Sequence, residues 1–238
     1  MANSNHDNPR SLGIIGLGAF GRLMAGHLSP HVRLYGCDPA VVAHRPIVVL
    51  ATPVNRFGAV IAAIRPHLRP GALVLDVGSV KIAPAEVMKR DLPDHVDIVG
   101  THPLFGPQSA QGGIRGLKIA VCPIRGARAP RVAAFLRKAL GLKVILTTPD
   151  AHDREVATAQ GLTHLIAKVL VGMEPLPRRM TAPSFDLLAK AAEMVRYDAP
   201  EVFLAIEKTN PYARAVRKRF FALAAELDAA LARPGGGE

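Results

Sequence analysis

A short apolar run followed at once by a glycine motif constrains the fold of this chain more than any other feature. The run Leu12-Gly13-Ile14-Ile15 is typical of a buried strand, and it leads directly into Gly16-Leu17-Gly18-Ala19-Phe20-Gly21, which has the spacing G-x-G-x-x-G. Apolar residues then recur at helical spacing as far as Leu28. A strand, a glycine loop and a helix in this order predict a βα unit that holds a dinucleotide on residues 16 to 21.

An acidic residue further along indicates which dinucleotide the unit would hold. A second apolar run, Val32 to Cys37, ends at Asp38, close to the spacing of about 20 residues at which a carboxylate binds the ribose hydroxyls. Such a carboxylate repels a 2′-phosphate, so the pattern favours NAD, with NADP as the less favoured cofactor. The alternative is that Asp38 is only a turn residue before Pro39.

The connection after Asp38 is unusually short. Parallel strands normally need a crossover of about a dozen or more residues. Here only Pro39 to Pro46 precede Ile47-Val48-Val49-Leu50, which is typical of the next buried strand. We therefore expect a truncated connection that leaves the adenine side of the cofactor site more open. Thr52 and Pro53 follow this strand, and we expect them to line the cofactor site.

The remaining pattern divides the chain near residue 149. Strand-like and helix-like segments alternate up to Leu146, and the sequence beyond Thr148-Pro149-Asp150 is helical throughout. We predict an α/β Rossmann-type dinucleotide-binding domain over 12–149 and an all-α domain over 150–232, with flexible tails at 1–11 and 233–238. Long apolar stripes in so small a helical domain predict that it pairs with a second copy, giving a homodimer.

Composition argues against several other classes of protein. No apolar run reaches the length of a membrane span, and the polar segment Met1 to Arg10 has no apolar signal core, so we expect a cytoplasmic protein that does not bind membranes. The net charge of +11 is scattered, and its densest cluster, Arg214 to Arg219, has the spacing of a solvated helix face, so we expect no nucleic-acid partner. Cys37 and Cys122 fit no metal or disulfide pattern, and we expect no metal.

Two polar loops are the candidate sites of chemistry. His102 lies in Gly100 to Ser109, directly after the apolar run Val96 to Val99 and between glycines and prolines that restrict the loop. Gly78-Ser79-Val80-Lys81 follows a central strand, at the end where open α/β sheets bind ligands. Each loop also has a purely structural interpretation: a packing histidine in the first, and a helix cap with a solvated lysine in the second.

With these loops, and with His152-Asp153 and His164 in the helical region, the chain resembles the prephenate and arogenate dehydrogenases of tyrosine biosynthesis from about Leu12 to Leu231. The loop His102-Pro103-Leu104-Phe105-Gly106-Pro107-Gln108-Ser109 is most similar to the arogenate-preferring, plant-like branch. The resemblance implies oxidative decarboxylation of arogenate to tyrosine, or of prephenate to 4-hydroxyphenylpyruvate, with hydride transfer to a nicotinamide cofactor.

The resemblance also implies a role for individual residues. His102 would be the base or acceptor for the substrate's ring hydroxyl, and Ser79 would bond the same hydroxyl or position the nicotinamide. Lys81 would orient its loop or an anionic group, while His152 would orient the loop or the domain junction. The residues expected to bind substrate are His164, Thr163, Lys81, Gln108 and Ser109.

The sequence departs from the family pattern where the substrate side chain would bind. Pro183 to Lys190 stands where bacterial members carry an arginine-containing segment, so Lys190 or Arg196 would have to replace that arginine. A carboxylate such as Asp198 would favour the ammonium group of arogenate. The alternatives are a dehydrogenase acting on an aminated prephenate analogue or a β-hydroxy acid, and a sensor that binds NAD without chemistry.

Overall fold

The computed structural model describes residues 11–36 and 38–233. Cys37 and the greater part of both expected tails therefore lie outside the described residues, while Ser11, which we expected in the first tail, begins a strand. The chain forms two compact units that divide between His152 and Asp153, whereas the change in sequence pattern falls near residue 149.

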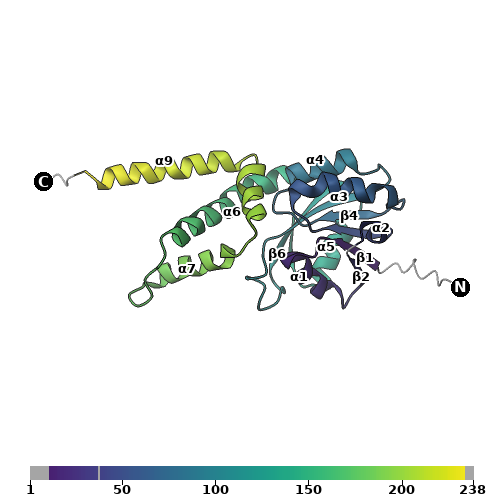
Figure 1. The fold of residues 1–238 in the computed structure, drawn as a ribbon, viewed down its shortest axis with the longest axis horizontal. Coiled ribbons are helices and arrows are strands. Elements are labelled where there is room, and N and C mark those ends of the chain that lie inside the picture. The colour runs from purple at the N-terminus through teal and green to yellow at the C-terminus, as the bar shows by residue number, and fades with distance from the viewer. Residues whose placement is uncertain (1–10, 37, 234–238) are drawn as a thin grey trace. The chain divides into compact units, whose positions relative to one another are not determined.

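The first unit is built on a seven-stranded sheet with the order β2-β1-β3-β4-β5-β6-β7 (Figure 1). Neighbouring strands are parallel except β5 and β6, which are antiparallel. The central strands are buried because helices cover both faces, as parallel sheets require. The strands are β1 (Ser11–Ile15), β2 (Arg33–Gly36), β3 (Ile47–Leu50), β4 (Leu73–Asp76), β5 (Asp97–Pro103), β6 (Lys118–Arg125) and β7 (Lys143–Leu146).

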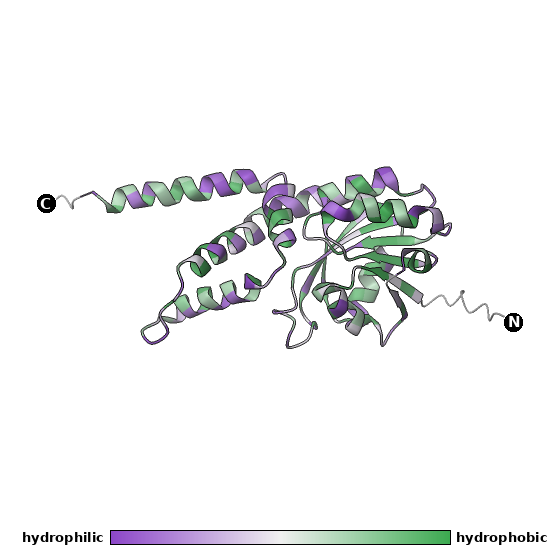
Figure 2. Ribbon diagram, in the orientation of Figure 1, coloured by the Kyte–Doolittle hydropathy of each residue, from purple (hydrophilic) through white to green (hydrophobic). Residues whose placement is uncertain are grey.

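Helices cover the two faces of the sheet unequally. One apolar cluster joins the sheet to α1 (Ala19–Leu28) and α5 (Ala129–Lys138). The other joins it to α2 (Pro39–Ala43), α3 (Phe57–Ile64) and α4 (Ile82–Asp91). Short 3-10 turns at Val54–Arg56 and Arg65–His67 flank α3. Figure 2 shows the strands as the most hydrophobic part of this unit.

The short connection after Asp38 takes the chain across β1. The five-residue helix α2 leads from β2, at the edge of the sheet, to β3 on the opposite side of β1. A Cβ on Gly13 would lie 2.4 Å from Val42 Cγ1, so α2 lies directly over β1. The crossover is possible at this length because Gly13 has no side chain.

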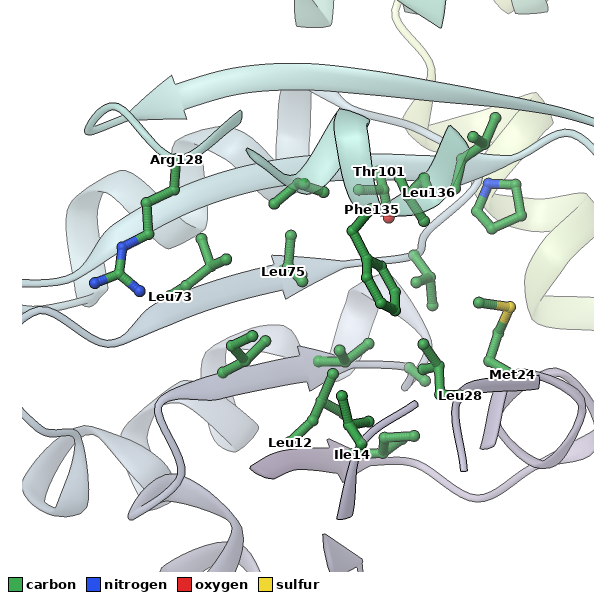
Figure 3. Close-up of a pocket in the computed structure, with 18 of the residues that line it drawn as sticks. Leu12, Ile14, Met24, Leu28, Leu73, Leu75, Thr101, Arg128, Phe135 and Leu136 are labelled. Carbon is green, nitrogen blue, oxygen red and sulfur yellow. The ribbon is translucent and has the colours of Figure 1, made fainter. Parts of the chain in front are cut away.

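An apolar cavity of about 270 Å³ lies on the α1 and α5 face of the sheet (Figure 3). Among the helices that the structure describes, only these two line it: α1 contacts β1, and α5 contacts β6 and β7. The cavity lies over the strands between them, whose side chains Val49 and Leu73 are buried. The lining residues labelled in Figure 3 include Leu12, Ile14, Met24, Leu73, Leu75 and Phe135.

The second unit is helical. Its long helix α6 (Pro149–Gly172) starts before the division of the chain, and α7 (Pro183–Arg196), α8 (Pro200–Leu204), a π-helical turn (Ala205–Thr209) and α9 (Ala213–Leu231) follow. Many large apolar residues remain exposed on these helices, for example Leu187 at 69% on α7 and Leu227 at 61% on α9. Within the described ranges, every helix is too short or too polar to span a lipid bilayer. A Rossmann-type unit followed by a helical unit confirms the predicted fold class.

Candidate functional site

The three glycines of the loop between β1 and α1 have different surroundings. Gly16 has φ +100°, and a Cβ there would lie 2.5 Å from the carbonyl oxygen of Ala51. A Cβ on Gly21 would lie 1.9 Å from the carbonyl oxygen of Gly16. A Cβ on Gly18 would meet no atom of the described chain within 4 Å. Packing therefore requires two of the glycines, while the third keeps backbone N–H groups open to a ligand, which fits a pyrophosphate.

Residues at the ends of β2 and β3 complete this edge of the sheet. Asp38 is the N-cap of α2, and its Oδ1 accepts a hydrogen bond from the Ala40 N–H at 2.9 Å. Its side chain is exposed at the same edge as the glycine loop, because β1 and β2 are parallel neighbours. The buried hydroxyl of Thr52 has no hydrogen-bond partner in the part of the chain that the structure describes, and Pro53 follows it. An exposed carboxylate, an unpaired hydroxyl and an open glycine fit a dinucleotide.

A buried ion pair shapes the loop that carries Ser79. The Asp76 carboxylate accepts hydrogen bonds from the Gly78 N–H at 2.9 Å and from the Lys81 ammonium, and both charged side chains are fully buried. Burial raises the pKa of Asp76, and the Lys81 charge opposes that rise. Of the two roles expected for Lys81, the geometry fits the orientation of the loop. Ser79 lies half-buried on this braced loop.

His102 lies on β5 and contacts a second histidine. Its Nδ1 is 2.8 Å from the Nε2 of His152, in the first turns of α6, and the two ring planes are inclined at 66° to each other. Both imidazoles are buried. Burial, followed by the charges of His152 and Lys81, holds the pKa of His102 well below its usual value. His102 is therefore a neutral imidazole near pH 7, which can accept a proton or a hydrogen bond.

The loop after His102 packs back on the glycine-loop helix. The ring of Phe105 lies 6.3 Å from that of Phe20 in α1. The hydroxyl of Ser109 accepts from the Gly106 N–H at 3.0 Å, and the amide oxygen of Gln108 accepts from Gln111 at 3.2 Å. Ser109 and Gln108, which we expected to bind substrate, thus make these hydrogen bonds within their own loop.

The helical unit contains the other residues expected to bind substrate. His164 is buried, with Nδ1 2.9 Å from the carbonyl oxygen of Gln160 and Nε2 3.2 Å from Asp198 Oδ2. The hydroxyl of Thr163 donates to the carbonyl of Ala159, one turn back in α6. His164 and Asp198 therefore meet, a pairing that their separation in sequence does not indicate.

The two candidates for an anion-binding side chain differ in their surroundings. Arg196 forms a two-pronged ion pair with Glu174, with 2.7 Å between Nη2 and Oε2. The pair lines a cleft of about 630 Å³ in the helical unit. Lys190 is exposed on α7. Arg196 is thus already bound to a carboxylate, whereas Lys190 faces solvent.

The structure brings several predicted residues together in the first unit. The glycine loop, Asp38 and Thr52 lie at the same edge of the sheet. Ser79 lies in the loop after β4, and His102 lies on the neighbouring strand β5. Sequence patterns did not predict the contact between His102 and His152. The sequence does place His152 near the start of a helix that follows the last strand, but only the fold brings it to β5.

Comparisons with known proteins agree on one family. Residues 35–159 match the family described as prephenate dehydrogenase, nucleotide-binding domain. The chain is 29% identical over 185 residues to a probable arogenate/prephenate dehydrogenase of Methanocaldococcus jannaschii, covering 73% of this chain and 41% of that protein. It is 30% identical over 179 residues to chloroplastic arogenate dehydrogenase 2 of Arabidopsis thaliana, covering 71% of this chain and 49% of that protein. The chain thus spans about half the length of these relatives.

A solved structure of the same family shares the fold. The prephenate dehydrogenase from A. aeolicus, in complex with hydroxyphenyl propionate and NAD+, superimposes with a TM-score of 0.71 at 18% identity. The match covers 93% of this chain and 90% of that chain. At this identity the comparison establishes the arrangement of the elements.

Proposed function

Because the chain belongs to the prephenate dehydrogenase family, we propose that it catalyses the oxidative decarboxylation of arogenate or prephenate with NAD as the cofactor. In this reaction a hydride leaves the carbinol carbon of the ring and the ring carboxylate departs as CO2. The observation that carries the proposal is a buried, neutral His102 in the same unit as an open glycine loop. When bound, the nicotinamide supplies a hydride acceptor.

His102 would act as the general base. The substrate hydroxyl loses its proton as the hydride leaves, and a neutral imidazole accepts that proton. The depressed pKa of His102 favours the unprotonated ring that this role requires. Ser79, on the braced loop after β4, would hydrogen-bond the same hydroxyl or position the nicotinamide.

Asp38 supports NAD as the preferred cofactor. Its exposed carboxylate, at the end of β2, would bind the ribose hydroxyls and repel a 2′-phosphate. The residues proposed to hold the pyrophosphate are the loop from Gly16 to Gly21, with Thr52 and Pro53 beside it.

Asp198 supports arogenate as the preferred substrate. We propose that His164 and Thr163 contribute to substrate binding, and Asp198 lies beside His164 with 22% of its side chain exposed. A carboxylate there would attract the ammonium group that arogenate has and prephenate lacks. Asp198→Asn should therefore lower the ratio of kcat/KM for arogenate over prephenate by about tenfold, the equivalent of about 1.4 kcal/mol.

A matched control separates this effect from a general loss of charge. Glu193 is an exposed carboxylate on α7, with 58% of its side chain accessible. Glu193→Gln should leave the ratio unchanged. An Asp198→Asn enzyme with the wild-type ratio would remove Asp198 from substrate discrimination.

The apolar surface of the helical unit supports a homodimer. More than half of the residue surface is exposed at each of Met173, Leu187, Leu223 and Leu227. We propose that a second copy covers this surface, because soluble monomers rarely expose so many large apolar groups. Sedimentation equilibrium should give twice the mass of the chain, and a monomer at micromolar concentration would contradict the proposal.

The proposed activity is tested by measuring the reduced cofactor formed from arogenate and prephenate, each with NAD and with NADP. We expect turnover of at least one substrate, faster with NAD. His102→Asn should bind NAD normally and lose about two or more orders of magnitude in kcat.

Three results would contradict the proposal. Near-normal turnover by His102→Asn would show that His102 is not the general base. Binding of NAD without turnover of either substrate would indicate a sensor, and turnover only of an aminated analogue or a β-hydroxy acid would indicate a related dehydrogenase.

A further inference from the structure

The contact between His102 and His152 constrains where the protons of both rings lie. Two ring nitrogens 2.8 Å apart form a hydrogen bond only if one carries a proton and the other offers a lone pair. A neutral imidazole carries a single proton, on one of its two nitrogens. The contact therefore decides which nitrogen of His102 is basic.

Only one of the two arrangements leaves the far nitrogen of His102 able to take a proton. If the His152 Nε2–H donates, the lone pair on His102 Nδ1 is engaged and the proton of that ring is on Nε2. If the His102 Nδ1–H donates to His152 Nε2, then His102 Nε2 keeps its lone pair. A base acting through Nε2 requires the second arrangement.

We propose that His152 is the positioning residue of His102: its Nε2 accepts the hydrogen bond from Nδ1–H, holds the ring, and leaves Nε2 of His102 as the base. The proposal rests on the proposed function. In the proton-transfer step the O–H bond of the substrate hydroxyl breaks and an Nε2–H bond forms on His102. The hydrogen bond to His152 then becomes charge-assisted and stronger, which stabilises the imidazolium.

A histidine partner affects the protonation of His102 differently from a carboxylate partner. Groups that act on it include His152 from α6 and Lys81 from the loop before α4, with Asp76 of β4 bound to that lysine. A carboxylate partner would hold His102 protonated in mild acid. A neutral imidazole orients the ring without adding negative charge, so His102 stays unprotonated over a wider pH range.

Two substitutions of His152 separate orientation from simple packing. His152→Gln keeps a neutral acceptor, whereas His152→Leu keeps similar bulk and removes the acceptor. We expect kcat within about tenfold of wild type for His152→Gln and a loss of about 100-fold or more for His152→Leu, with NAD binding unchanged in both. We also expect the acidic limb of the pH profile of kcat to move to higher pH in His152→Gln. The positive charge that His152 can carry lowers the pKa of His102, and this substitution removes it.

The position of the proton can be read without turnover. In 15N NMR of the unliganded chain at pH 7.5, we expect Nδ1 of His102 to be protonated and Nε2 to be unprotonated in wild type and in His152→Gln. His152→Leu should lose this preference. A protonated Nε2 in wild type, or wild-type kcat in His152→Leu, would overturn the proposal.

The two proposals fail in different ways. If the wild-type chain turns over neither arogenate nor prephenate, the proposed function fails, whereas the NMR result still shows which ring donates. If turnover is normal but Nε2 of His102 is protonated at rest, the proposed function stands and His152 is not its positioning residue.

Discussion

The sharpest prediction concerns Gly18, where folding and cofactor binding can be separated. Gly18 has φ −66° and ψ −170°, a conformation open to any L-residue. A Cβ there would meet nothing in the described chain within 4 Å. Gly18→Ala should therefore change the free energy of unfolding by no more than about 0.5 kcal/mol.

The same methyl group should obstruct a bound pyrophosphate. The middle glycine of the motif lets the phosphates approach backbone N–H groups, and a hydrogen bond to a charged group is worth about 1.5–3 kcal/mol. Loss of one such bond raises the Kd for NAD by at least about tenfold. The assay is calorimetric titration of NAD, with urea unfolding of the same preparation.

Gly26→Ala in the same helix is the matched control. A Cβ at Gly26 also meets nothing within 4 Å in the described structure, and the residue is exposed in the interior of α1. This variant should gain about 0.5–1 kcal/mol in stability and bind NAD as the wild type does. Unchanged NAD affinity in Gly18→Ala would refute the assignment of this loop to the pyrophosphate.

Two further predictions concern stability. The pKa of His102 is lower in the folded chain than the unfolded value of about 6.5, so its contribution to folding stability is complete above pH 6.5 and is lost as the pH falls below it, at up to about 1.4 kcal/mol per pH unit. In urea unfolding from pH 7.5 to 5, the free energy of unfolding should therefore change less steeply with pH in His102→Gln than in the wild type. An equal pH dependence in both would contradict this. Val49→Ile should raise the free energy of unfolding by about 0.5–1 kcal/mol, because Val49 lines the cavity and the added methyl group would fill part of it. Val48→Ile should lower it by about 1–3 kcal/mol, because Val48 is fully buried on the other face of the sheet. Equal effects of the two substitutions in thermal unfolding would disprove the cavity.

Local patterns were sufficient for the first βα unit and for the fold class. The glycine spacing, the apolar run before it and the helical periodicity after it all concern neighbouring residues, and β1 and α1 lie where they were expected. The family resemblance, based on the Ser79 and His102 loops, is confirmed by the match over residues 35–159.

Pairing between distant residues was less accessible to sequence. The antiparallel direction of β6 beside β5 depends on contacts across the sheet, and an apolar run has the same pattern in either direction. The burial of Lys81 with Asp76 likewise depends on the packing around β4 and β5, so the motif alone left a solvated lysine as an alternative. The contacts of His102 with His152 and of His164 with Asp198 join segments far apart in the chain.

The short segment after Asp38 has one feature that the sequence predicted and one that depends on tertiary packing. Its length predicted a truncated connection, because too few residues remain for a full crossover helix. The path that it takes, across β1 and over Gly13, is set by tertiary packing against Val42. β2 is left as the edge of the sheet.

Oxidative decarboxylation is tested most directly by the ratio of CO2 released to reduced cofactor formed. With substrate labelled at the ring carboxylate, we expect one CO2 for each NADH at every time point, whether arogenate or prephenate is used. NADH formed without CO2 would show simple oxidation of an alcohol and would contradict oxidative decarboxylation.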